Sequence, residues 1–323
     1  MKTKQHKVGE NKSEVLKALP IACMDETKAV EFIEAQRWGE IPCCPHCGGK
    51  EVSQMKDKDG NRNERFLWRC ANCQKSKAKQ SQFTVRVGTV FESSRIPLKY
   101  WCYVFWRACT SKKGVSALEI QRQTGLSYKS ALFLLHRIRY AMAPENVELL
   151  KGTVEVDETY VGGKPRYRGN NKRGRGTKKQ PVLAMVERGG NVKAHVIPNV
   201  SGKTLKTAIR ESVDKSSRIM TDENPSYNGL HDFAGGHHPI NHSLNEYVRG
   251  DITTNTVESF FAIVKRGING VYHCVSKKHL HRYLSEFEFR YNHRKLEDGE
   301  RVVALIKNTQ GKRLLYREPV SLN

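Results

Sequence analysis

The chain has 323 residues, of which 38% are hydrophobic, so it is long enough for two or three domains and apolar enough to exclude a disordered protein. Its net charge of +23, from 56 basic and 33 acidic residues, predicts a polyanionic partner. We find no stretch of roughly 18 apolar residues that could span a membrane and no convincing secretory signal, so we expect a cytoplasmic protein without a membrane partner.

The first segment, residues 1–37, is polar at its start and weakly helical from Glu26 to Arg37. A zinc ribbon is predicted at residues 38–93, because four of the nine cysteines form two CxxC pairs, Cys44–Cys47 and Cys70–Cys73. Two such pairs complete the tetrahedral thiolate site of a structural Zn²⁺ and leave no open position for catalysis. Cys43 and His46 are substitute ligands, and four reduced thiols in a small core are the alternative.

Apolar and polar residues alternate from Gln82 to Glu92, which predicts a strand that closes the ribbon. Residues 95–146 are predicted to be helical. A short helix, a turn at Gly125 and a longer helix match the helix-turn-helix pattern of DNA-binding proteins. The second helix places Lys129 and Arg137 off its apolar face, as it does Tyr128, His136 and Arg139. An ordinary helical hairpin with a solvated charged face is the alternative.

The pattern changes to strands near residue 152. Strands are predicted at Thr153–Tyr160, Val182–Glu187, Val192–Ile197 and Arg218–Asp222 with a weak one at His238–Ser243, and helices at Ser201–Val213, Asn255–Ile268 and Lys277–Arg294. This order is typical of a ribonuclease H-like domain, a mixed sheet flanked by helices. We expect this α/β catalytic core at residues 150–298 and a C-terminal tail at 299–323.

The loop at residues 164–179 contains eight Lys or Arg and neither Asp nor Glu. Such a loop is suited to contact DNA phosphates, although a solvated hairpin tip is the alternative. The candidate DNA-binding residues in this loop are Lys164, Arg166, Arg168, Lys172, Arg173 and Arg175.

Two aspartates are candidate metal ligands. Asp157 shares one face of the first strand with Glu155, and Glu158 points away from it. Asp222 ends the fourth strand, which lies beside the first in this order of elements. Because adjacent strands are about 4.8 Å apart, Asp157 and Asp222 could share a metal ion.

The predicted helix from Asn255 supplies a third carboxylate. Glu258 and Lys265 project about 20° apart around this helix, two turns from each other. Asn255 and Glu258 also match a capping box, which leaves Asn255 or Asp251 as an alternative third ligand. Three carboxylates can hold two Mg²⁺ (or Mn²⁺) ions for in-line displacement at phosphorus, with Lys265 and Arg266 near the phosphate oxygens.

At this point the chain resembles bacterial insertion-sequence transposases of the DDE superfamily that carry a zinc ribbon and an ISXO-type transposase domain. The resemblance covers residues from about 38 to 295 and rests on CPHCG (44–48), VEVDETYVGGK (154–164), MTDENPSY (220–227), NTVESFFAIVKRG (255–267) and HLHRYLSEFEFRYNHR (279–294).

The resemblance implies a ribonuclease H-like enzyme that nicks transposon ends and joins the 3′-hydroxyl to target DNA. It implies that Asp157, Asp222 and Glu258 hold the catalytic metal and that Lys265 is the following basic residue. Some members have Asn in the third place, which keeps Asn255 open. The implied partners are the terminal repeats and target DNA as double strands, a second or further copy of the chain on paired ends, and the bacterial nucleoid.

Two alternatives remain from other functional classes. One is a zinc-ribbon DNA-binding protein that has lost catalytic activity, and the other is a structure-specific DNA nuclease on the same fold. The predicted zinc ribbon and helix-turn-helix favour recognition of DNA ends over generic cleavage. The formation of joined strands separates a transposase from both.

Overall fold

The computed structural model describes residues 8–78, 80–144, 148–162, 179–241 and 248–315. These residues fall into two compact units. Of the described residues, those up to 111, those at 117–142 and those from 296 onward form the first unit, and those at 112–116 and between 143 and 295 form the second. Within the described ranges, none of the helices has both the length and the apolar character needed to cross a membrane.

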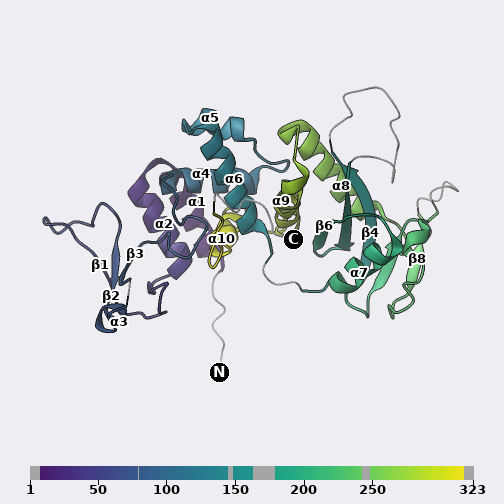
Figure 1. The fold of residues 1–323 in the computed structure, drawn as a ribbon, viewed down its shortest axis with the longest axis horizontal. Helices are drawn as coiled ribbons and strands as arrows, with labels where there is room; N and C mark the ends of the chain where they lie inside the picture. Colours follow the sequence, from purple (N-terminus) through teal and green to yellow (C-terminus); the bar gives the residue numbers. More distant parts are fainter. Residues whose placement is uncertain (1–7, 79, 145–147, 163–178, 242–247, 316–323) are drawn as a thin grey trace. The chain divides into compact units, whose positions relative to one another are not determined.

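The first unit is built mainly from helices (Figure 1). They are α1 (Val8–Met24), α2 (Glu26–Trp38), α4 (Leu98–Thr110), α5 (Ala117–Thr124), α6 (Tyr128–Met142) and α10 (Asp298–Lys307). The sequence assigned residues 299–323 to a tail, whereas α10 buries Val302, Leu305 and Ile306 and packs with α4. Its apolar residues thus form part of the core of this unit.

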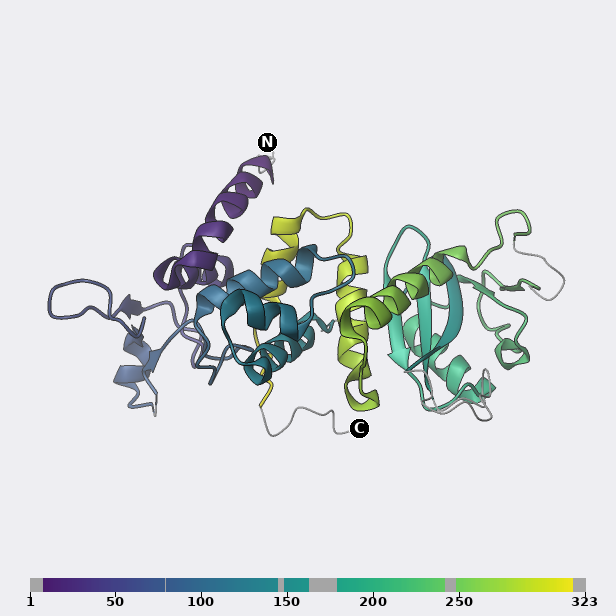
Figure 2. The same cartoon turned by 90° about the horizontal axis from the view of Figure 1, so that it is seen from above.

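The zinc-ribbon part of the first unit has three antiparallel strands and one short helix. They are β1 (Val52–Gln54), β2 (Trp68–Cys70), α3 (Ala71–Lys75) and β3 (Gln82–Phe83). The long hairpin between β1 and β2 projects away from this small sheet (Figures 1 and 2).

The strand predicted from Gln82 to Glu92 is wrong beyond Phe83. Its later apolar residues are buried in the helical core instead, where the Phe91 ring packs edge-on against Trp101 at 4.9 Å between centroids. The apolar residues alternate here because Phe83 belongs to the small core of the ribbon, whereas Val90 and Phe91 belong to the helical core.

The second unit contains a five-stranded mixed sheet in the order β6-β5-β4-β7-β8. Its strands are β4 (Thr153–Val161), β5 (Gln180–Glu187), β6 (Val192–Val196), β7 (Arg218–Thr221) and β8 (His237–Pro239). The first three pair antiparallel, whereas β4, β7 and β8 run parallel. The prediction that the fourth strand of this domain lies beside the first is confirmed by the pairing of β7 with β4.

Helices cover both faces of this sheet (Figures 1 and 2). Val154 and Val156 of β4 face α7 (Gly202–Ser212), and Val182 and Val186 of β5 face α8 (Asn255–Gly267) and α9 (Leu280–Asn292). Short turns connect these elements, namely η2 (Pro225–Tyr227), the π-helical η4 (Ile268–Tyr272) and η5 (Lys277–His279). The result is a three-layer α/β/α arrangement.

Helix α9 carries a glutamate whose burial predicts a pH-dependent stability. Glu288 is only 8% exposed, and burial raises its pKa to about 8, against about 4.3 in an unfolded chain. The folded state therefore binds this proton more tightly. The stability that neutral Glu288 contributes is present at pH 4 and is lost as the pH rises to 8.

We expect Glu288→Gln to leave the free energy of unfolding of the second unit nearly unchanged at pH 4.5 and to raise it by about 4.5 kcal/mol at pH 8. Urea titrations followed by far-ultraviolet circular dichroism at both values measure this difference. Tryptophan fluorescence does not, because Trp38, Trp68, Trp101 and Trp106 all belong to the first unit. A difference that does not change with pH contradicts the prediction.

Candidate functional site

The first candidate site is the thiol cluster of the zinc ribbon. The Sγ atoms of Cys44, Cys47, Cys70 and Cys73 all lie within 4.8 Å of one another. The distances between the Sγ atoms are 3.7 Å for Cys44 and Cys73 and 3.6 Å for Cys47 and Cys70. A tetrahedron with Zn–S bonds of about 2.3 Å has edges of about 3.8 Å, so the four thiols fit a structural Zn²⁺. Cys43 and His46 do not belong to this cluster.

The chain turns sharply after Cys47, as a metal knuckle requires. Gly48 adopts a positive φ of 71°, which favours glycine, and its backbone N–H donates to the carbonyl of Cys44 at 2.8 Å. The backbone N–H of Gly49 points at the Cys47 sulfur at 3.4 Å. On the other side of the cluster, the Cys73 N–H points at the Cys70 sulfur at 3.5 Å. These N–H groups stabilise thiolates at the two knuckles.

The second candidate site lies where β4 and β7 end side by side. Their parallel register pairs Val154 with Ile219 and Glu155 with Met220, an offset of 65 residues. The same offset places Asp157 opposite Asp222, just beyond the last paired residues. The Asp222 side chain accepts a hydrogen bond from the Asn224 backbone N–H at 3.1 Å, and Asp157 accepts one from the Glu158 N–H at 2.7 Å.

The carboxylates at this edge of the sheet interact electrostatically. Burial, together with the negative charges of Glu158, Asp222 and Glu258, raises the pKa of Asp157 to about 7. One carboxylate oxygen taken from each of Asp157, Asp222 and Glu258 does not give three atoms within 4.8 Å of one another, since in the described ranges only the four thiols form such a group. A buried carboxyl group surrounded by other carboxylates, as Asp157 is, suits a hard divalent cation such as Mg²⁺.

A hydrogen-bonded group beside Asp157 was missed by the sequence reasoning. Glu158 accepts from the Asn224 side chain at 2.9 Å and from the Tyr227 hydroxyl. Tyr227 is fully buried, and burial together with Glu158 raises its pKa well above its usual value. The MTDENPSY stretch thus ties the end of β7 to the end of β4. A tyrosine two residues after the turn residue Pro225 is the signal that could have indicated it.

The third predicted carboxylate lies in the first turn of α8. Glu258 is exposed and accepts a hydrogen bond from the Thr254 hydroxyl at 3.0 Å. Helix α8 has Thr254 at its N-cap and Asn255 as its first residue, so the predicted capping box does not form between Asn255 and Glu258. Asp251 forms an ion pair with Arg218, which lowers its pKa.

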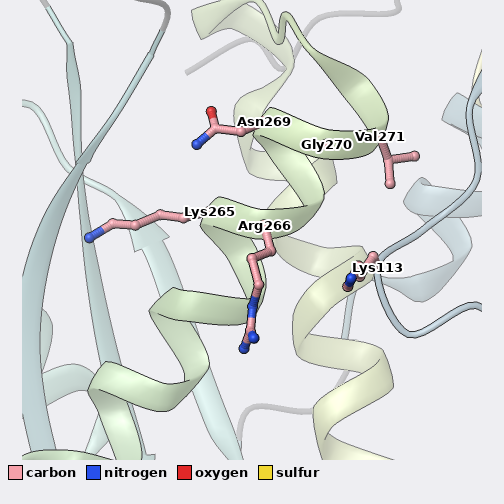
Figure 3. Close-up of a pocket in the computed structure, with 6 residues that line it drawn as sticks. All are labelled: Lys113, Lys265, Arg266, Asn269, Gly270 and Val271. Carbon is pink, nitrogen blue, oxygen red and sulfur yellow. The ribbon is translucent and has the colours of Figure 1, made fainter.

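Lys265 and Arg266 lie two turns further along α8 (Figure 3). They leave the helix in different directions and, with Lys113 and Asn269, line a cavity of about 500 Å³. Both α8 side chains are exposed. Three basic side chains around one cavity suit it to an anionic group such as a phosphate.

The predicted DNA-binding residues of α6 divide into two groups. Lys129 and Tyr128, in its first turn, are exposed. Arg137 corrects the prediction, because it is only 5% exposed and donates to the carbonyls of Val90 and Glu92 at 2.9 and 3.1 Å. His136 and Arg139 are buried as well. Arg137 therefore stabilises the first unit and is not presented to a phosphate.

The basic loop of the second unit lies outside the described residues, which end at 162 and resume at 179. Its candidate residues Lys164, Arg166, Arg168, Lys172, Arg173 and Arg175 are therefore not placed.

Comparison with known proteins places this arrangement in a family. Residues 149–292 match the ISXO2-like transposase domain, and residues 24–76 match the transposase zinc-ribbon domain. A protein of Halobacterium salinarum, described as an uncharacterized protein in transposable element ISH50, is 29% identical over 285 residues, or 83% of this chain and 91% of the relative. An uncharacterized transposase-like protein of Haemophilus influenzae is 32% identical over 102 residues, or 32% of this chain and 81% of the relative.

The matched domains define the class as transposases. The chain belongs to the family of insertion-sequence transposases that combine a transposase zinc ribbon with an ISXO2-like transposase domain.

Proposed function

We propose that this chain is a DNA transposase that nicks the ends of its element and joins the freed 3′-hydroxyl groups to target DNA. The observation that carries the proposal is the convergence of Asp157 and Asp222 at the ends of two adjacent parallel strands, with Glu258 close enough to raise the pKa of Asp157. The strand order β6-β5-β4-β7-β8 and the helices on both faces favour a ribonuclease H-like domain for this chemistry.

Asp157, Asp222 and Glu258 are the residues that would hold catalytic Mg²⁺ (or Mn²⁺). When bound, two such ions activate a water or 3′-hydroxyl and stabilise the leaving oxygen of an in-line displacement. The chain itself supplies the oxygen ligands and fixes two of them through the register of β4 with β7. The Thr254 hydroxyl orients Glu258 by donating to its carboxylate.

The remaining roles concern DNA. Lys265 and Arg266 would contact phosphate oxygens near the reacting group, because both are exposed on the helix that carries Glu258. Lys129 on α6 and the basic loop at residues 164–179 would hold the rest of the duplex. Because two ends must be cut and joined together, we propose that the active form is a dimer or larger assembly on paired ends.

A strand-transfer assay tests the proposal. It combines the full chain, Mg²⁺, target DNA and a labelled duplex carrying the element's own end, and compares the wild type with Asp222→Asn. The variant keeps the size of the side chain but removes the charge that a metal ligand needs. We expect joined products from the wild type and none from the variant.

Three other outcomes redirect the assignment. Tight binding of the end without cutting by the wild type would indicate a DNA-binding protein without catalysis. Cutting without joined products would indicate a nuclease on this fold. Equal activity of the wild type and Asp222→Asn would remove Asp222 from the metal site.

A further inference from the structure

Strand β4 carries a second acidic residue on the same face as Asp157. Glu155 is fully buried in the middle of the sheet, between Val154 and Val156. A carboxylate in such a place is costly unless it is hydrogen-bonded or paired with a charge. Glu155 is not one of the proposed metal ligands.

The Glu155 carboxylate accepts hydrogen bonds from the first turn of α8. It accepts from the backbone N–H groups of Thr256 and Val257 at 2.7 and 3.1 Å and from the Thr256 hydroxyl at 2.9 Å. Thr254, at the N-cap, makes no side-chain cap hydrogen bond to these N–H groups. A side chain from the sheet therefore caps the helix and places a negative charge at the positive end of its dipole.

Arg188 completes this connection from the turn after β5. Its Nε donates to the Glu155 carboxylate at 2.6 Å, and its terminal nitrogens donate to the carbonyls of Asp251 and Thr253 at 2.6 and 3.0 Å. One guanidinium thus neutralises the buried carboxylate and holds the segment that leads into α8.

We propose that Glu155, together with Arg188, is a positioning residue that sets the third carboxylate against the first two. This inference rests on the proposed function. Glu155 precedes Asp157 by two residues on a rigid strand, and its hydrogen bond to Val257 ends one residue before Glu258. Helix α8, which carries Glu258, is therefore hydrogen-bonded to strand β4, which carries Asp157, close to both proposed metal ligands.

The consequence is measurable as metal affinity. Residues that orient metal ligands change the affinity for the ion by roughly tenfold to a hundredfold when replaced. In Glu155→Gln the side-chain amide presents an N–H group toward donors, so it cannot accept from both α8 N–H groups and Arg188 together. We expect the first turn of α8 to loosen and the affinity for Mn²⁺ to fall by roughly that factor.

The matched control is Glu286→Gln on α9. Glu286 is also buried in the second unit, and it accepts from Arg290 and from the Tyr272 hydroxyl. This variant removes a comparable buried charge pair away from the start of α8. It should lower stability without weakening Mn²⁺ binding.

The experiment measures two quantities on the full, zinc-loaded chain without DNA. Electron paramagnetic resonance follows free Mn²⁺ during titration of the wild type, Glu155→Gln, Glu286→Gln and, as a reference for the site, Asp222→Asn. Hydrogen-exchange mass spectrometry follows the peptide around residues 250–260. Weaker binding and faster exchange in that peptide for Glu155→Gln, with Glu286→Gln like the wild type in both, support the inference.

Other outcomes overturn it. If Glu155→Gln binds Mn²⁺ like the wild type while Asp222→Asn does not, the positioning role fails and the metal site stands. If Glu155→Gln and Glu286→Gln weaken binding equally, the effect is general destabilisation and the positioning role fails. If Asp222→Asn binds like the wild type, both the metal site and the inference fail.

The variant Arg188→Lys tests the positioning role if Glu155→Gln does not fold. The Arg188 side chain is 27% exposed, so its replacement is tolerated more easily than that of the fully buried Glu155. Lysine keeps the positive charge but lacks the planar fork whose three nitrogens donate to Glu155 and to the two loop carbonyls. Weaker Mn²⁺ binding in this variant supports the inference, and wild-type binding overturns it.

Discussion

Replacing Glu258 by glutamine is expected to reduce strand cleavage and joining by about a thousandfold or more. Glu258 is the exposed carboxylate of α8 that contributes to the raised pKa of Asp157, and Thr254 orients it through a hydrogen bond. Loss of a catalytic metal ligand removes several kcal/mol of transition-state stabilisation, and each factor of ten corresponds to about 1.4 kcal/mol.

Asn255→Ala is the matched variant, since Asn255 is the alternative third ligand one turn earlier on the same helix. It is the first residue of α8, is exposed, and neither caps the helix nor contributes to the pKa of Asp157. We expect its activity to stay within a few-fold of the wild type. The strand-transfer assay in Mg²⁺ and in Mn²⁺ compares both variants. A large loss in Asn255→Ala with activity retained in Glu258→Gln would reverse the assignment.

Removal of zinc is expected to unfold the ribbon while the second unit remains folded. The ribbon has only two short hairpin pairings and a small apolar cluster around Cys44, Cys70, Cys73 and Phe83. Zinc sites of this kind contribute about 10–16 kcal/mol in isolated peptides, far more than so small a core can supply.

Tryptophan fluorescence measures this unfolding. Trp38 packs edge-on against Trp68 with 5.9 Å between ring centroids, next to the thiol cluster, so their emission should shift to longer wavelength after chelation. The buried Trp101 should keep its emission. Cys44→Ser should lose the zinc and reproduce the shift, whereas Cys43→Ser should keep the zinc and the unshifted emission. Unchanged emission after chelation would favour four reduced thiols in an apolar core.

The sequence predicted the strands and helices of the second unit well because their periodicity is clear. Apolar runs gave β4, β5 and β6, and the helical stripe around Phe260 and Phe261 gave α8. The order of these elements was enough to predict the contact between β4 and β7. The CxxC pairs likewise indicated the thiol cluster without any knowledge of the fold.

The sequence failed where a charged side chain has its partners far along the chain. Arg137 has a charge at a position that helical periodicity assigns to the surface, yet its acceptors are carbonyls some 45 residues earlier. Glu155 binds N–H groups about 100 residues later. Periodicity describes only which face a residue occupies, so it cannot identify which polar groups compensate a buried charge.

The position of helix α10 in the sequence determines the order in which the two units can finish folding. It belongs to the first unit, although residues 143–295 of the second unit precede it in the chain. During synthesis the nascent chain therefore contains strands β4 to β8 of the second unit before α10 of the first emerges. Until then the apolar face of α4 that α10 covers stays exposed to water. The first unit therefore begins to be translated before the second but can be completed only after it. A ribosome that stalls near residue 295 leaves the first unit without α10 and exposed to aggregation and proteolysis.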